Sequence, residues 1–226
     1  MSLESALVSD IKTAGRSRVY ALLAEAFSFP QGAAVLRLLD GDLLAELKEA
    51  FEQTAYIVQF PDELTMPPTK DAIQELQVIY TELFDVTSGT PKVSLLERRY
   101  CDTPEQELWQ KVLRFYSHFG LDFSEGGGEE QPDHLLTELG FMHYLSFLEA
   151  GSPSVSDTES FQRGQRDFLR LHIGTWAESL VEKLAEPDMI HPYLQLGRLL
   201  ENLVRNDLDH LEECVPTQNE DEEVEH

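Results

Sequence analysis

The chain has 226 residues, of which 42% are hydrophobic, so it can bury a core and is not disordered by composition. Its 42 acidic and 17 basic residues give a net charge of −25. This charge disfavours binding to nucleic acid and anionic membranes and favours basic partners. A high acidic charge can also serve only to keep a protein soluble. There is no basic segment before an apolar run, and no apolar stretch approaches ~18 residues, so we expect a cytoplasmic protein with neither signal peptide nor membrane insertion.

Apolar residues recur at helical spacing through nearly the whole chain, and strand patterns are missing. The first helix, for example, places Ile11, Val19, Leu23 and Phe27 on one face and stops at Pro30. The clearest helical segments are 9–30, 41–58, 67–84, 103–120, 132–149, 156–187 and 191–213. We therefore predict an all-α protein, a single-domain bundle of about eight or more helices. The expected division is an all-α domain at 1–215 and an acidic disordered tail at 216–226.

One helix carries strong signals at both ends. Thr103 is predicted as its N-cap, Pro104 as its first helical residue and Gln106 as the partner in a capping box. Gly120 marks its C-terminal stop.

Two further predictions concern helix faces and continuity. The segment 156–187 is predicted to be one long helix, with His172 and Trp176 in register on its apolar face. Ile73 is expected to begin the apolar face of the helix at 67–84.

No pattern typical of a catalytic or metal centre is present in the sequence. A pair of Glu-x-x-His motifs on facing helices, as in di-iron bundles, is missing, and so are HExxH and Cys/His clusters. A related pattern, Asp207-x-x-His210, is expected on a solvated face. Cys101 and Cys214 form no CxxC pair, and Cys101 is interpreted as an ordinary loop cysteine although it follows two arginines. Nucleophile elbows, Walker loops and dinucleotide fingerprints are also missing. We therefore predict no catalytic residue, no metal and no cofactor.

The stretch "EEQPDHLLTELGFMHYL" begins with an acidic corner that leads into a helix. The negative charges of Glu130 and Asp133 would interact favourably with the helix dipole at the N-terminal end of that helix. Their carboxylates could also cap its free N–H groups. His134 is expected to be half-exposed beside two acids, which favours its protonated form. The corner can be a well-capped helix start, a binding corner or, least favoured, a catalytic pair.

A second stretch, "YTELFDVTSGTPKVSLLERRYC", places aromatic residues beside a polar loop. Tyr80 and Phe84 lie one helical turn apart, and Asp85 closes their helix. The loop that follows ends in Arg98, Arg99 and Tyr100. The aromatic residues can belong to the core or line a groove for a peptide.

Together these stretches resemble the NarJ/TorD/DmsD family of redox-enzyme maturation chaperones. The resemblance lies in the pair Tyr80 and Phe84, in the corner "EQPDH" at 130–134, and in a late His-x-x-x-Trp pattern, and it covers roughly residues 15–205. The order of the corner resembles the nitrate-reductase type, and the Pro-Pro-aromatic-x-Ser segment of TorD and DmsD is missing. The chain is most similar to the chaperones of type II enzymes of the dimethyl-sulfoxide-reductase family, which act on dimethyl sulfide, ethylbenzene, selenate or chlorate.

The resemblance implies an all-α chaperone without catalytic activity. Such a protein binds the apo catalytic subunit of a molybdenum oxidoreductase, assists insertion of the molybdenum cofactor, and holds the subunit back from twin-arginine export until it is mature. Its partner would be that subunit and possibly its twin-arginine leader. The implied client-binding residues are Tyr80, Phe84, Asp85, Arg98, Arg99, Tyr100, Glu130, Pro132, Asp133, His134 and Glu138.

The oligomeric state is expected to be a monomer or a helix-swapped dimer, with the loops at 85–102 and 120–131 as candidate hinges. Two alternative functions are retained. One is an acidic adaptor for a basic helix or peptide of another client, and the other is a small metal-dependent all-α enzyme that uses Asp133 and His134.

Overall fold

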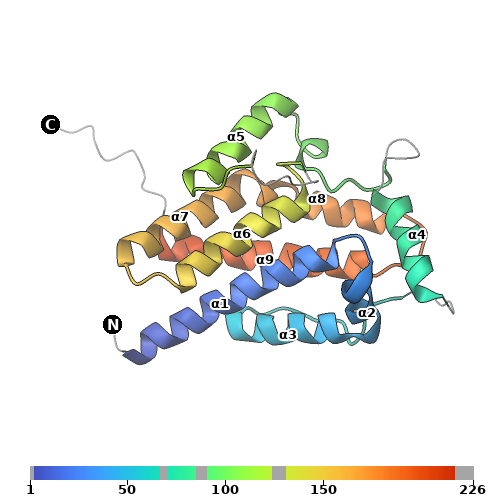
Figure 1. Cartoon of the computed structure of the whole chain (residues 1–226), viewed down its shortest axis with the longest axis horizontal. Helices are drawn as coiled ribbons and strands as arrows, with labels where there is room; N and C mark the ends of the chain where they lie inside the picture. Colours follow the sequence, from blue (N-terminus) through green and yellow to red (C-terminus); the bar gives the residue numbers. More distant parts are fainter. Residues whose placement is uncertain (1–2, 67–70, 85–90, 124–130, 217–226) are drawn as a thin grey trace.

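Nine α-helices and one short 3-10 helix make up the regular structure of the residues that the computed structural model describes, which are 3–66, 71–84, 91–123 and 131–216 (Figure 1). In chain order the helices are α1 (Leu3–Ala26), α2 (Gly32–Asp40), α3 (Asp42–Thr54), α4 (Ala72–Phe84), η1 (Glu97–Arg99), α5 (Glu105–His118), α6 (Leu135–Ala150), α7 (Val155–Leu171), α8 (Ile173–Ala185) and α9 (Tyr193–Cys214). The prediction of an all-α, single-domain bundle is confirmed.

The long helix α1 organises the bundle. It packs against α3 on one side and against α6 on the other, and it also touches α9 (Figure 1). The pairs α6 with α7 and α8 with α9 complete the central layer. Helix α4 lies at one end, and α5 lies across the outside of the bundle, above α6 and α7 (Figure 1).

Helical spacing of apolar residues accounts for most of the core. Val19 and Leu23 of α1, and Phe27 directly after it, have no exposed surface, as predicted. Two predicted core residues are wrong, because Ile11 is 56% exposed and Ile73 is 38% exposed. Ile11 lies toward the N-terminal end of α1, which extends past α3 (Figure 1), and Ile73 lies in the first turn of α4.

The predicted helix at 156–187 is in fact two helices. The chain breaks at His172, whose φ of −129° and ψ of −111° are not helical. A Cβ atom at Gly174 would lie only 2.2 Å from the backbone oxygen of Leu169, so the close approach of the two helix ends needs a glycine there.

The ends of α5 confirm one sequence signal and correct another. Gly120 follows the helix with a φ of 79°, as expected for a C-terminal stop. The helix begins at Glu105, with Pro104 as the N-cap and no side-chain hydrogen bond at the cap. The predicted capping box of Thr103 and Gln106 is therefore wrong.

A polar cluster is buried where α1, α6, α7 and α9 meet. Arg16, which is 1% exposed, binds Asp207 and donates a hydrogen bond of 3.0 Å to Glu149. Asp207 also accepts hydrogen bonds of 2.6 Å from the hydroxyl groups of Tyr20 and Tyr56. The prediction that Asp207 lies on a solvated face is wrong, because this residue has no exposed surface.

The acidic tail at 216–226 lies almost wholly outside the described residues, and so do the candidate hinge residues 85–90 and 124–130. Within the part of the chain that the structure describes, none of the helices combines the length and the apolar character that a membrane crossing requires.

Candidate functional site

His134, in the corner that precedes α6, is the N-cap of this helix. Its Nδ1 atom accepts a hydrogen bond of 3.2 Å from the backbone N–H of Leu136. This corrects the expectation that Asp133 caps the helix. Glu130, the other predicted cap, lies outside the described residues.

Asp133 is fully buried and joins three elements. Its Oδ1 atom accepts hydrogen bonds of 2.7 Å from the guanidinium group of Arg98 and of 2.8 Å from Nε1 of Trp109. Its Oδ2 atom accepts a longer bond of 3.3 Å from the backbone N–H of Arg98. Asp133 therefore fixes η1 and α5 to the start of α6.

We call residues 91–101, which include η1, the strap. Its backbone pairs with the corner through Glu97 N–H to Asp133 O at 2.9 Å and Leu135 N–H to Leu95 O at 2.8 Å. Leu95 itself is 4% exposed, which anchors the strap to the core. The strap and the corner therefore form one unit, although about thirty residues separate them in sequence.

Two carboxyl groups lie buried beneath the strap. Glu97, 2% exposed, pairs with Nδ1 of His172 at 3.0 Å, and Glu138, fully buried, accepts a hydrogen bond of 3.2 Å from Nε1 of Trp176. Burial, the charge of Glu97 and a hydrogen bond with that group raise the pKa of Glu138 well above its ordinary value. Glu138 therefore keeps its proton to a higher pH than an exposed glutamate does.

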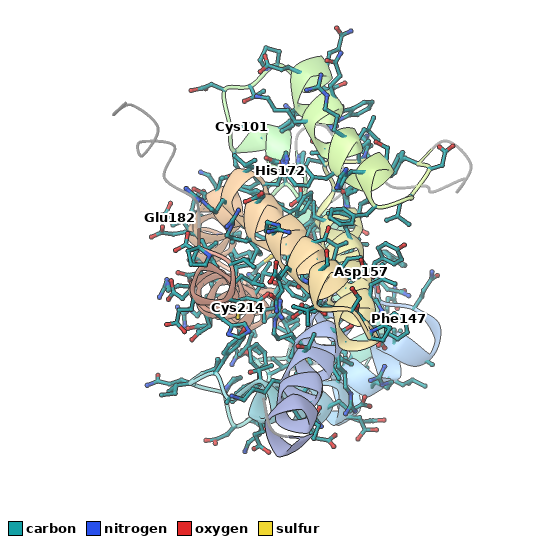
Figure 2. The ribbon with its side chains drawn as sticks, turned by 90° about the vertical axis from the view of Figure 1, so that its left-hand side faces the viewer. Cys101, Phe147, Asp157, His172, Glu182 and Cys214 are labelled. Carbon is teal, nitrogen blue, oxygen red and sulfur yellow. The ribbon has the colours of Figure 1, made fainter. Side chains whose placement is uncertain are left out.

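Figure 2 shows His172 below the segment that carries Cys101, at the junction of α7 and α8. The neighbouring Tyr100 stacks on Trp176 with the ring centres 5.2 Å apart. The strap is thus bound to the helix break that the sequence did not predict.

Tyr80 and Phe84 belong to a second cluster, at the end of α4. Their rings are 4.9 Å apart, and the ring of Phe84 lies 5.1 Å from that of Tyr193. The hydroxyl group of Tyr80 donates a hydrogen bond of 3.1 Å to the backbone oxygen of Phe27. Both residues are half-buried. They are therefore part core and part surface, and a groove for a peptide at this place stays a prediction.

The predicted site residues thus fall into two groups. The structure brings together Arg98, Tyr100, Pro132, Asp133, His134 and Glu138 at the strap and corner. A hydrogen bond of 2.9 Å from Val93 N–H to Leu83 O connects the strap to the end of α4 and so to the aromatic cluster. Arg99 is exposed on the strap, and Asp85 lies outside the described residues.

Sequence reasoning missed Glu97 and Trp109. Glu97 directly follows the apolar residues Leu95 and Leu96 of the strap, and Trp109 faces the corner from α5. A charged residue that continues an apolar run was the available signal for Glu97. No such signal marks Trp109. Among the described residues, no three His, Cys, Asp or Glu side chains are grouped so that they could hold a metal ion.

Comparison with known proteins matches residues 40–182 to a family model described as nitrate reductase delta subunit. The selenate reductase assembly chaperone protein of Thauera selenatis is 31% identical over 199 residues, which cover 87% of this chain and 90% of that protein. The perchlorate reductase assembly chaperone protein of Dechloromonas aromatica (strain RCB) is 30% identical over 170 residues, 73% of this chain and 75% of that protein. The chlorate reductase assembly chaperone protein of Ideonella dechloratans is 34% identical over 135 residues, 58% of this chain and 67% of that protein.

Proposed function

Because this chain belongs to the nitrate reductase delta subunit family, we propose that it is an assembly chaperone for the catalytic subunit of a molybdenum oxidoreductase. The observation that carries the proposal is the 31% identity to a selenate reductase assembly chaperone over 87% of this chain. The resemblance to maturation chaperones seen in the sequence motifs is confirmed by this family membership.

In this proposal the protein acts by binding, not by catalysis. It holds the apo subunit while the molybdenum cofactor is inserted, and it delays twin-arginine export until insertion is complete. It works in the cytoplasm, where the subunit is made. The contacts with the leader and the choice between a monomer and a helix-swapped dimer stay predictions, as do the domain at 1–215 and the tail at 216–226.

The geometry supports two roles for the predicted site residues. Asp133 and Glu138 are fully buried, so direct contact with a client would require the strap to open. We assign them, with Arg98, to positioning the strap against the corner. Exposed Arg99 and half-buried His134 are then the surface residues proposed to touch the client, and Tyr80 and Phe84 extend that surface.

The net charge of −25 supports a client segment that is basic. The same charge also favours the alternative of an acidic adaptor for other basic peptides. The two functions differ in selectivity, because an adaptor would capture several basic proteins in a salt-dependent way and show no preference for a redox subunit.

The test is an affinity purification of the tagged protein from its native host during anaerobic respiration, with the captured proteins identified by mass spectrometry. We expect one molybdopterin-binding catalytic subunit to be enriched with the wild type. Capture of mixed basic proteins would support the adaptor, and stoichiometric metal in the purified protein would support the enzyme. The absence of a redox subunit would refute the chaperone function.

Two variants of His134 separate contact from capping in the same experiment. Asparagine is a good N-cap, so His134→Asn keeps the helix start but removes the imidazole, whereas His134→Ala removes both. If the ring touches the client, both variants should lose about fivefold or more of the captured subunit. If only His134→Ala loses it, His134 acts as a helix cap alone. Arg205→Ala, an exposed change on α9, is the control.

A further inference from the structure

Glu138 is held beneath the strap in surroundings that lack hydrogen-bond donors. The residue has no exposed surface. Nε1 of Trp176 donates to its Oε2 atom at 3.2 Å, but its Oε1 atom has no donor among the described residues. An ionised carboxylate only accepts hydrogen bonds, and in a site without water each oxygen needs a donor. The closed strap therefore favours the protonated form of this group over the ionised form.

The carboxyl groups around Glu138 act in the same direction. Burial is the main cause of its raised pKa, and the charge of Glu97 and a hydrogen bond with that group come next. The charge of Asp133 adds to the shift, while the hydrogen bond from Trp176 opposes it. Because two carboxylates cannot hydrogen-bond to each other without a proton, the contact with Glu97 also depends on the proton that Glu138 keeps.

The cationic groups near this site are already bound to other carboxylates. The guanidinium group of Arg98 binds Asp133 at 2.7 Å and Glu105 at 3.3 Å. Nδ1 of His172 pairs with Glu97 at 3.0 Å, so the charge of this ring, when present, serves a carboxyl group that it already contacts. A new negative charge beneath the strap would therefore be buried without a cation of its own.

The neutral neighbours on α5 and α8 do not supply the missing donors. The hydroxyl group of Tyr116 donates to the backbone oxygen of Pro132 at 2.8 Å, and burial raises its pKa, so it brings neither a free donor nor a charge. Trp176 has one N–H group and already donates it. Further donors for an ionised Glu138 must then come from water, which the closed strap excludes.

The end of the strap is the part that can admit water. Val93 and Leu95 are 1% and 4% exposed and anchor its first half in the core. After Glu97, residues 98–101 are all half-buried or exposed. A movement of residues 97–101 would hydrate the carboxyl groups and leave the anchored half in place.

We propose that Glu97 and Glu138 form a proton-controlled latch of the strap. With a proton on Glu138, residues 97–101 close over α8. When that proton is released, like-charge repulsion and hydration open this end of the strap while the helical bundle stays folded. The strap thus opens as the pH rises, not as it falls. The latch is a property of this protein alone, and only its use, to uncover the corner for a client, rests on the proposed chaperone function.

Both tryptophans of the chain report on this movement. Trp176 stacks on Tyr100 with the ring centres 5.2 Å apart, and Trp109 lies 5.7 Å from the guanidinium group of Arg98. Tryptophan fluorescence is recorded from about pH 5 to pH 9. Far-ultraviolet circular dichroism at each pH shows whether helix content is kept.

A thiol at the end of the strap gives a second measurement. Cys101 is half-buried there, and Figure 2 shows Cys214 well away from it. In a Cys214→Ser background, the rate at which a maleimide modifies Cys101 is compared with the rate in the same protein carrying Glu138→Gln. The comparison at each pH removes the intrinsic pH dependence of the thiol.

We expect modification of the wild type to become at least about tenfold faster than that of Glu138→Gln toward pH 9, with a change in tryptophan fluorescence and unchanged helix content. Glu138→Gln should show neither change, because glutamine has no proton to release. Glu97→Gln should also suppress opening, since it removes the like charge and its amide can donate to Glu138. If Glu138→Gln does not fold, Glu97→Gln serves as the reference. Glu178→Gln, on the exposed face of α8, should behave like the wild type.

The latch is refuted if Glu138→Gln opens like the wild type, because another group, such as His172, would then control the strap. It is also refuted if nothing changes across the pH range, or if helix content is lost together with the change in fluorescence. The affinity purification described above tests the chaperone function separately. Capture of a redox subunit without pH-dependent opening leaves the function and removes the latch, whereas opening without capture leaves the latch and removes the function.

Discussion

Arg98 and Arg99 are neighbours in sequence but have different physical surroundings. The side chain of Arg98 is 15% exposed, lies over the ring of Trp109 and pairs with a carboxylate that has no exposed surface. Arg99 is exposed on the outside of the strap. Only the first residue can therefore contribute strongly to stability, since surface charges are screened by water.

Arg98→Ala should lower the free energy of unfolding by about 2–4 kcal/mol, because it leaves Asp133 buried without its cation. Arg99→Ala should change it by less than about 0.5 kcal/mol. Urea unfolding of both variants checks this prediction. Equal effects of the two substitutions would mean that the ion pair with Asp133 does not hold the strap.

Glu138 should make stability depend on pH. Its pKa is raised in the folded protein by burial and by Glu97, above the 4.5 of an ordinary glutamate. As the pH rises above that ordinary value, the unfolded chain releases this proton while the folded protein keeps it. The folded state thus loses relative stability from there up to its own raised pKa.

The variant Glu138→Gln isolates this effect, because glutamine has a similar shape and no proton to release. We expect its free energy of unfolding to decline less than that of the wild type between about pH 5 and pH 8. Unfolding curves across that range are the measurement, with Glu178→Gln on the exposed face of α8 as the control. Parallel pH profiles of wild type and Glu138→Gln would show that the buried carboxyl group is ionised.

At the scale of the helix, the break between α7 and α8 is the element on which the strap depends. His172 can reach Glu97 because the chain leaves helical geometry at this residue. Gly174 permits the break, since its missing side chain lets the helix ends approach. In a continuous helix, His172 would still share the apolar face with Trp176, but its ring would meet the strap from another direction.

Gly174→Ala should therefore destabilise the protein by about 2–4 kcal/mol, because the Cβ atom would collide with backbone that cannot move freely. Gly151→Ala is the matched control, since a Cβ atom there would meet its nearest neighbour at an ordinary 3.7 Å. Thermal or urea unfolding of both variants gives the comparison. If Gly174→Ala is as stable as Gly151→Ala, the break does not need a glycine.

At the scale of the whole molecule, the buried cluster around Arg16 connects helices from both ends of the chain. Its members come from α1, α6, α7 and α9, and Tyr56 joins it from the segment after α3. One cation faces two buried carboxylates, Glu149 and Asp207. Such a cluster favours this arrangement of the helices, because separating them would leave buried charges without partners.

Arg16→Leu should lower the free energy of unfolding by about 3–5 kcal/mol or more, because both carboxylates would lose their cation in the interior. Arg18→Leu, two residues away, removes ion pairs with Glu46 and Glu49 at a side chain that is 39% exposed, and it should cost about 1 kcal/mol or less. Chemical unfolding distinguishes the two. Similar losses would contradict a central role for the cluster.

The sequence by itself determined the fold class, the approximate positions of most helices and the family. Helical periodicity is a local property, because side chains three and four residues apart decide which face of a helix is apolar. The same local logic correctly marked the stop at Gly120. The order of the motifs around Tyr80, the corner and Trp176 was enough to indicate the family, since it requires no knowledge of contacts.

Only the tertiary structure decided which polar residues are buried and what they bind. Arg16 and Asp207 are 191 residues apart in sequence, and Glu97 and His172 are 75 apart. The cost of burying a charge is offset by partners that the fold brings together, so no local pattern distinguishes a buried Asp207 from a solvated one. The helix break at His172 belongs with them, because the ring of this residue pairs with Glu97 of the distant strap.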